Sequence, residues 1–189
     1  MDKRIRDIIK DSIAVKEALA AKETAAIARA AAAIAKSVKS GGKLMVFCNG
    51  GSAADSQHMV AEFVGRFKKE RKALAAIALT TNTSTLTAVG NDYGYDATFS
   101  RQVEALGRKG DVAVGISTSG NSKNVIEAIR KARSSGILTI GLIGGAGGLL
   151  KGECDISIIV PSTNTPRIQE SHLLIIHAIC ELVEEEMIK

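Results

Sequence analysis

Short apolar runs alternate with helical patterns along most of this chain. The β-type runs occur at five places: Leu44–Cys48, Ala75–Leu79, Val112–Ser117, Leu138–Ile143 and Ile156–Val160. They are apolar at consecutive positions, which is typical of strands covered on both faces of a sheet. Because helical segments separate them, the pattern predicts an α/β fold, a three-layer αβα sandwich around a five-stranded parallel sheet.

Helical patterns also flank this alternating region. Residues 3–39 are predicted to form two helices or one bent helix, which Ser40-Gly41-Gly42 ends. The last helix is predicted to start at Thr165-Pro166, with Thr as the N-cap and Pro at the first position. We see no linker, repeat or low-complexity tract, so we expect residues 1–189 to form one domain.

The composition narrows the class of protein. Hydrophobic residues make up 46% of the chain, and no apolar stretch without a charge is long enough to cross a membrane. The three widely spaced cysteines favour reduced thiols in a cytoplasm, and we see no secretory signal. Aromatic residues are only 3%, so the basic run Arg66–Lys72 is interpreted as a solvated helix end and not as a nucleic-acid site. We expect neither nucleic-acid nor membrane partners.

The first strand ends in a polar, glycine-rich turn. Asn49, Gly50, Gly51 and Ser52 follow Cys48 directly and precede a helical pattern. Backbone N–H groups in such a turn, together with the helix N-terminus, favour an anion, most often phosphate. The sequence therefore predicts a site for a small phosphorylated substrate at this turn.

A second turn of this kind follows the third strand. It contains Ser117, Thr118, Ser119 and Ser122 and opens the helix Lys123–Ser134. Ser and Thr also favour helix caps and turns for structural reasons alone, but two such turns in one chain favour phosphate binding. The glycine-rich segment Gly141–Gly148 does not match a nucleotide-binding motif and is interpreted as a flexible turn.

Four side chains form a candidate metal site. His58 and Glu62 lie four residues apart and share one face of the predicted helix. Gln169 and His177 lie on the last helix, and imidazole and carboxylate groups both suit Zn²⁺. Gln169 and His177 would be roughly 12 Å apart along a straight helix, so they can hardly reach one ion together. We therefore hypothesise a site shared between subunits.

Several segments in combination resemble the bacterial phosphoheptose isomerases of the sugar-isomerase (SIS) domain superfamily. They are the turn Asn49–Asp55 with His58 and Glu62, Asn91–Gly94, Phe99–Ala105, Ser117–Ser122 and Arg167–Glu170. The resemblance runs nearly from end to end. It implies a homotetramer with active sites between subunits, in which residues 1–39 serve oligomerisation. It also implies conversion of sedoheptulose 7-phosphate to D-glycero-D-manno-heptose 7-phosphate, the first step toward the heptose of lipopolysaccharide.

The same resemblance implies roles for individual residues. Substrate-binding residues would be Asn49, Gly50, Gly51, Ser52, Glu62, Asn91, Asp92, Ser117, Thr118, Ser119, Ser122 and Gln169. One zinc ion per subunit would be bound by His58, Glu62, Gln169 and His177, and Glu62 and His177 would be the acid/base pair. Cys48 departs from the family, which usually has Gly there, and its side chain would crowd the strand end. His172 is interpreted as a surface residue.

These residue types suit the reaction. A ketose and an aldose interconvert through a cis-enediol, which requires one proton to move between carbons and others between oxygens. A carboxylate such as Glu62 can carry the carbon proton, and an imidazole such as His177 can serve the oxygens. Zinc could polarise the carbonyl or fix the two side chains.

Three alternatives remain at this point. The chain could be a non-enzymatic SIS-domain protein that binds the replication initiator, although that group lacks the acid/base residues present here as Glu62 and His177. It could isomerise a pentose or hexose phosphate, since the phosphate turn would serve any of them. It could also be a sugar-phosphate sensor, but such modules usually carry a DNA-binding segment, and we see none.

Overall fold

The computed structural model describes residues 1–189 and confirms the predicted α/β sandwich. One sheet contains all five strands: β1 (Leu44–Phe47), β2 (Ala76–Ala78), β3 (Val112–Ser117), β4 (Leu138–Gly144) and β5 (Ile156–Val160). Their order is β2-β1-β3-β4-β5, and every neighbouring pair is parallel. The predicted strands are therefore confirmed, with ends that differ by at most one residue.

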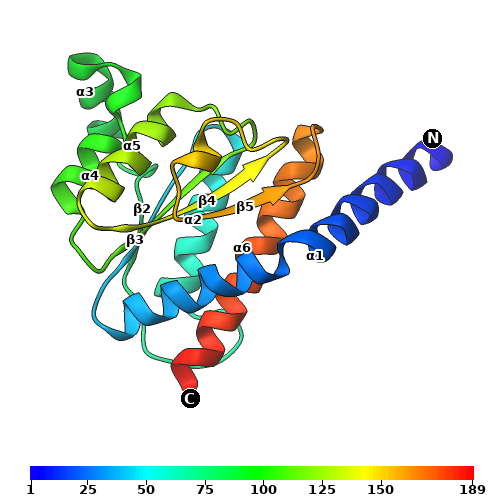
Figure 1. Cartoon of the computed structure of the whole chain (residues 1–189), viewed down its shortest axis with the longest axis horizontal. Coiled ribbons are helices and arrows are strands. Elements are labelled where there is room, and N and C mark those ends of the chain that lie inside the picture. Colours follow the sequence, from blue (N-terminus) through cyan, green and yellow to red (C-terminus); the bar gives the residue numbers. More distant parts are fainter.

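Helices cover both faces of this sheet (Figure 1). The six α-helices are α1 (Asp2–Lys39), α2 (Gly51–Val64), α3 (Thr83–Tyr93), α4 (Ser100–Leu106), α5 (Lys123–Ser134) and α6 (Thr165–Ile188). One core cluster joins α1, α2 and α6 to the sheet, and a second joins α4 and α5 to its other face. In β1, Leu44 and Val46 belong to the first cluster, while Met45 and Phe47 belong to the second. Burial on both faces explains why the strand is apolar at every position.

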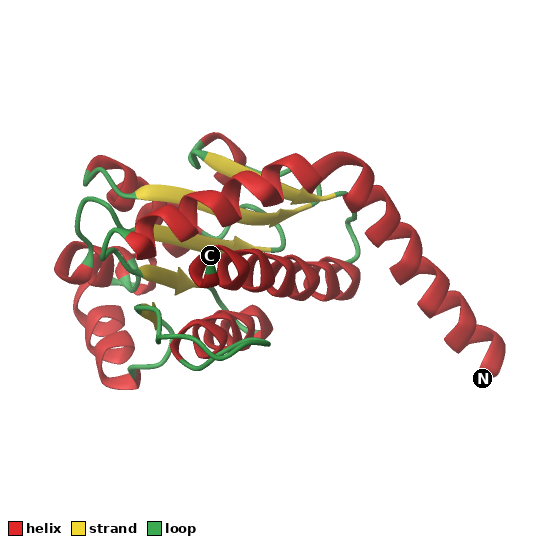
Figure 2. Ribbon diagram, turned by 90° about the horizontal axis from the view of Figure 1, so that it is seen from below, coloured by secondary structure: helices red, strands yellow, loops and turns green.

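The N-terminal segment forms one continuous helix, α1, which settles the choice between one helix and two. Its first half extends away from the body of the molecule (Figures 1 and 2). Three isoleucines there, Ile5, Ile9 and Ile13, remain 50%, 53% and 49% exposed. Since their spacing of four places them on one side of the helix, the chain presents an apolar stripe to solvent. None of the helices is both long and apolar enough to span a bilayer.

The last helix begins where the sequence predicts, with a shift of one residue in its cap. Asn164 is the N-cap of α6, Thr165 is its first residue and Pro166 lies in the first turn. Pro is tolerated there because the first N–H groups of a helix have no intrahelical partner.

The basic segment after α2 differs from its interpretation as a solvated helix end. α2 ends at Val64, and residues 66–72 are irregular. The side chain of Arg71 is only 5% exposed and forms an ion pair with Glu184, which is 3% exposed. The interpretation was therefore wrong for Arg71, because charge alone does not reveal a buried partner 113 residues away.

Candidate active site

The strand order places both predicted phosphate turns at one edge of the sheet. After β1 the chain runs to β2 on one side and then to β3 on the other side of β1. In open parallel sheets, ligands bind at the carboxyl ends of the strands where the order reverses in this way. The turn that starts at Asn49 follows β1, and the turn that starts at Ser117 closes β3, so the two turns flank this switch point.

Glycine gives the first turn its shape. Gly50 is the N-cap of α2 and has φ of 57°, in the left-handed region that other residues avoid. At Gly51, a Cβ atom would lie 3.1 Å from Nε2 of Gln169. The missing side chain at Gly51 therefore lets Gln169 of α6 approach the start of α2 closely, beside the predicted substrate turn.

A network of amides fixes Asn49. The side chains of Asn49 and Asn124 donate to each other over 2.8 Å in both directions, and the hydroxyl of Tyr95 donates to Oδ1 of Asn49 over 2.9 Å. Asn124 is 2% exposed, in the first turn of α5. Sequence reasoning missed both partners. The only sequence signal for Asn124 is that a polar residue stands directly before the apolar residues of α5.

Hydroxyl groups organise the second turn. The hydroxyls of Ser117 and Ser122 lie 2.9 Å apart, and the backbone N–H of Gly120 donates to Oγ of Ser117 over 3.1 Å. Ser119 is exposed, and Thr118 and Ser122 are half-buried. Ser122 is also the N-cap of α5, and its side chain does not bond to that helix. The turn thus presents hydroxyls beside a helix N-terminus, an arrangement that favours phosphate.

The segment after β4 supports this second turn. The N–H of Leu150 donates to the carbonyl of Gly120 over 2.9 Å, and the N–H of Leu149 donates to Oδ1 of Asn121 over 3.0 Å. A Cβ atom on Gly120 would overlap the carbonyl of Gly147. The interpretation of Gly141–Gly148 as a flexible turn missed this contact, because the glycines are needed for close approach to a segment far away in sequence.

The predicted acid/base residues lie together between α2 and α6. Nε2 of His58 is 3.0 Å from Oε1 of Glu62 and 3.4 Å from Nε2 of His177. The two imidazole rings meet edge to face, with centroids 5.0 Å apart. Two ring nitrogens that face each other with a carboxylate beside them can share a proton or a cation.

Three of the four predicted zinc ligands belong to this group. Zn–N bonds of about 2.0–2.1 Å in a tetrahedral site place neighbouring donor atoms about 3.3–3.4 Å apart. The separations of 3.0 and 3.4 Å around His58 are close to this value. No three His, Cys, Asp or Glu side chains of the chain enclose a common metal position. The fit to zinc therefore lies in the donor types and the pairwise distances.

Gln169 lies apart from the other three predicted ligands. Gln169 approaches α2 at Gly51. His177 contacts α2 at His58, which lies two turns after Gly51 along α2. Because α2 and α6 run side by side, Gln169 and His177 of α6 face different turns of α2. The predicted separation of Gln169 from His177 along the helix is thus consistent with the geometry of one chain.

Asn91 and Asp92 are not brought to the other predicted residues within one chain. Both are exposed at the end of α3, and Nδ2 of Asn91 donates to Oδ1 of Asp92 over 2.8 Å. No residue of α3 is buried. The residues that follow α3 do reach the site, because Tyr95 donates to Asn49 and Thr98 accepts from Asn124.

His172 and Cys48 are both buried, although the sequence predicts an exposed His172 and a Cys48 side chain that crowds the strand end. His172 is 0% exposed, so its interpretation as a surface residue was wrong. Burial lowers the pKa of His172 to about 4; no hydrogen bond reaches either ring nitrogen, although the Ile143 backbone lies close enough to oppose the shift. Cys48 is buried in the core with α1 and α6, and burial raises its pKa to about 12.

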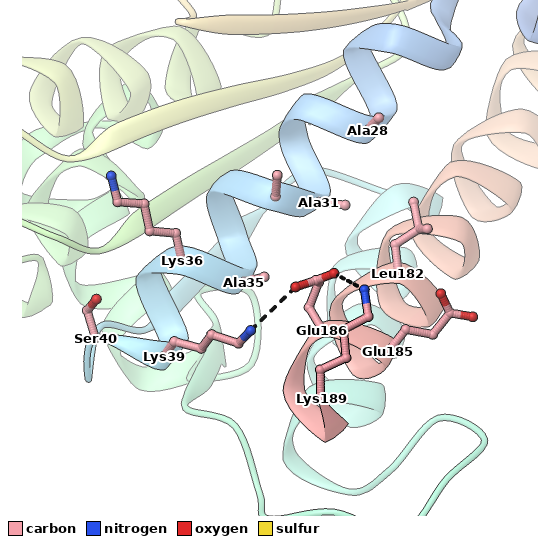
Figure 3. Close-up of a pocket in the computed structure, with 11 residues that line it drawn as sticks. Ala28, Ala31, Ala35, Lys36, Lys39, Ser40, Leu182, Glu185, Glu186 and Lys189 are labelled. Carbon is pink, nitrogen blue, oxygen red and sulfur yellow. Dashed lines mark hydrogen bonds and ion pairs between the residues drawn. The ribbon is translucent and has the colours of Figure 1, made fainter.

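The chain also forms a cavity of about 470 Å³ far from these residues, between the C-terminal ends of α1 and α6 (Figure 3). Alanines of α1 form one wall, and Lys39 and Lys189 both pair with Glu186 at its edge. It contains none of the predicted site residues. The candidate active site is therefore defined by the predicted residues at the ends of β1 and β3 and between α2 and α6.

Comparisons with known proteins identify the family and the fold. The SIS-domain family model matches residues 9–144. A phosphoheptose isomerase of Geobacter metallireducens is 52% identical over 189 residues, which are 100% of both chains. The solved phosphoheptose isomerase of Neisseria gonorrhoeae has a TM-score of 0.92 at 44% identity, over 97% of this chain and 98% of that one. The enzyme from Francisella tularensis has a TM-score of 0.93 at 39% identity, over 97% of each chain. This chain therefore belongs to the phosphoheptose isomerase family of SIS-domain proteins.

Proposed function

We propose that this protein converts sedoheptulose 7-phosphate to D-glycero-D-manno-heptose 7-phosphate. Membership of the family supports this reaction, and so do the two turns at the switch point. The observation that carries the proposal is the grouping of Glu62, His58 and His177 between the two helices that also border the first turn. Such a grouping suits acid/base chemistry next to a bound sugar phosphate.

The reaction requires two proton transfers at carbon and two at oxygen. Glu62 removes a proton from C1 of the ketose while the oxygen on C2 gains one, which gives the cis-enediol. The enediol then loses the proton of its C1 hydroxyl and gains a proton at C2, which gives the aldose. His177 serves the oxygens, and the turn from Ser117 to Ser122 holds the phosphate.

A zinc ion, one per subunit, is part of the proposal. His58, Glu62, Gln169 and His177 would bind it. When bound, zinc would polarise the oxygens on C1 and C2 and favour the enediol. Because metal ligation lowers the basicity of a carboxylate, Glu62 would alternate between binding the metal and accepting the proton from the substrate.

A homotetramer with shared active sites is also part of the proposal. The exposed stripe of Ile5, Ile9 and Ile13 on the protruding half of α1 supports burial against another copy, because apolar patches of this kind mark association surfaces. The exposed positions of Asn91 and Asp92 and the separation of Gln169 from His177 are what a site completed by a neighbouring subunit would require. Three free cysteines suit a reducing cytoplasm, where heptose precursors of lipopolysaccharide would be made.

The test compares sugar phosphates and a single variant. Purified protein is assayed with sedoheptulose 7-phosphate and with pentose and hexose phosphates, and Glu62→Gln is assayed alongside. We expect turnover of the heptulose phosphate in clear preference to the others, and a loss of at least about 100-fold in kcat for the variant. Preference for a shorter sugar would overturn the substrate, and full activity of Glu62→Gln would overturn the role of Glu62. A pull-down that retained the replication initiator, without turnover, would favour the binding-protein alternative.

A further inference from the structure

The irregular segment after α2 is held by one buried carboxylate. Glu184 of α6 is 2% exposed and accepts hydrogen bonds from the backbone N–H groups of Phe67, Lys68 and Lys69, at 2.9, 2.8 and 2.9 Å. Burial alone raises the pKa of this carboxyl, but the three N–H groups and the charge of Arg71 outweigh burial and hold the pKa below its usual range. Glu184 is therefore ionised and fixed at neutral pH.

Arg71 completes the arrangement at the end of α2. Its Nη2 donates to the carbonyl of Glu62 over 2.6 Å, and its Nη1 donates to the carbonyls of Phe63 and Gly65 over 3.0 and 3.3 Å. Its Nε lies 3.4 Å from Oε1 of Glu184, an ion-pair distance without hydrogen-bond geometry. Arg71 thus caps the C-terminus of α2, where a cation is favoured by unpaired carbonyls and the helix dipole.

This buried pair contacts Glu62 directly and His177 through Phe67. Arg71 binds the main-chain carbonyl of Glu62 itself. Glu184 holds the backbone of Phe67, whose ring packs on the imidazole of His177 with centroids 5.5 Å apart. The segment therefore connects the helix that carries Glu62 to the ring of His177.

We propose that Glu184 and Arg71 are positioning residues for catalysis: they fix the segment 65–72 so that Glu62 and His177 keep the relative geometry that proton transfer requires. The inference rests on the proposed roles of Glu62 and His177. A buried ion pair is a weak source of stability, because desolvation offsets most of its attraction. Its location at the main chain of Glu62 and at the neighbour of His177 is what points to catalysis.

The test uses Glu184→Gln, with Glu181→Gln as the matched control. Glu181 lies one turn earlier on α6 and binds the same segment through Nζ of Lys68 over 2.7 Å, but that pair is exposed. For Glu184→Gln we expect kcat to fall about 10- to 100-fold, because small misplacements of catalytic groups cost that much. The KM for sedoheptulose 7-phosphate should change by less than about twofold, because the substrate turns lie elsewhere. The control should keep the kcat of the parent protein.

A second variant covers the case in which Glu184→Gln does not fold. Phe67→Leu keeps the ion pair and removes only the ring that packs on His177, so we expect it to lower kcat with little change in KM and to alter the pH dependence of kcat. Folding of each variant is checked by its thermal unfolding midpoint. Parent-like kcat and pH dependence in both folded variants, or in folded Phe67→Leu alone where Glu184→Gln does not fold, would overturn the inference.

Glu62→Gln, measured in the same series, separates the two hypotheses. If Glu62→Gln loses activity while the Glu184 and Phe67 variants keep theirs, the positioning role is wrong and the catalytic role stands. If Glu62→Gln keeps its activity, the proposed catalytic pair itself is wrong.

Discussion

Nε2 of His177 lies 3.4 Å from Nε2 of His58, although 119 residues separate them in the chain. The contact exists because α2 and α6 pack side by side on one face of the sheet. It joins a residue that follows the first strand to one near the end of the chain. The candidate active site is thus a product of the topology as much as of any single motif.

The hydroxyl of Tyr95 should contribute to substrate binding through Asn49. Removing it with Tyr95→Phe deletes one hydrogen bond, which is worth about 1 kcal/mol, so kcat/KM should fall about fivefold. Tyr93→Phe is the matched control, because Tyr93 is equally exposed, at 61%, and its ring packs against Arg101. Steady-state kinetics give kcat/KM for both variants. Equal losses in the two variants would contradict the role of Tyr95.

Gly120→Ala should disrupt the second phosphate turn. Gly120 has φ of 69°, and an added Cβ would overlap the carbonyl of Gly147, so the free energy of unfolding should fall by more than about 2 kcal/mol. The KM for sugar phosphate should rise as well, because the turn would have to shift.

Gly41→Ala is the control for backbone strain alone. Gly41 has φ of 83° but nothing lies within 4 Å of an added Cβ, so about 1 kcal/mol is expected. Denaturant unfolding gives both values. Equal losses in the two variants would show that the contact with Gly147 is unimportant.

His172 should make the protein less stable in acid. Burial lowers its folded-state pKa from the usual 6.5 to about 4, so the unfolded chain binds more protons between these two pH values. The free energy of unfolding is therefore not reduced by His172 above pH 6.5. It falls as the pH drops toward 4, and protonation of this group accounts for about 2–3 kcal/mol of the loss.

Replacing His172 with Leu tests this directly. The free energy of unfolding of His172→Leu should depend less on pH than that of the parent protein over this window. Denaturant titrations at pH 7 and at pH 4.5 measure the difference. The same pH dependence in both proteins would mean that His172 is not buried in its neutral form.

The exposed stripe on α1 should be required for assembly. Replacing Ile5, Ile9 and Ile13 together by Gln removes its apolar surface while the helix remains, since Gln is a good helix former. If the protein is the proposed tetramer, we expect the mass measured by sedimentation to be that of four chains for the parent protein and smaller for the triple variant, with loss of turnover. Leu106→Gln, on α4 and 40% exposed, is the control. An unchanged mass of the triple variant would contradict the role of the stripe.

The sheet and its turns could be predicted from sequence because they depend on local signals. Buried parallel strands such as Val112–Ser117 are continuous apolar runs, and their ends are marked by Gly, Ser and Thr. The same signals predicted where the two polar turns lie, and phosphate binding at these turns stays a prediction. The residue types alone offered Gln169 and His177 as candidate metal ligands, whereas the family resemblance supplied the acid/base roles of Glu62 and His177. The contact of His177 with His58 could not be predicted, because it depends on how α2 and α6 pack.

What could not be predicted depends on contacts between distant segments. Nothing local marks Glu184 as the acceptor for the segment that starts at Phe67, nor His172 as a fully buried residue in a helix with charged neighbours. The glycines after β4 were interpreted as a flexible turn because glycine-rich sequence is typical of one. Their close approach to Gly120 is visible only in the packed structure. Sequence periodicity reports which face of an element is buried, but not which partner covers it.

The most direct test of the account is the turnover of sedoheptulose 7-phosphate by the purified protein before and after removal of bound metal with a chelator. We expect turnover in the metal-loaded protein, its loss on chelation, and its recovery when one equivalent of zinc per subunit is added back. Turnover that chelation leaves unchanged would contradict the zinc site at His58, Glu62 and His177. Absence of turnover from the zinc-loaded protein would contradict the proposed reaction itself.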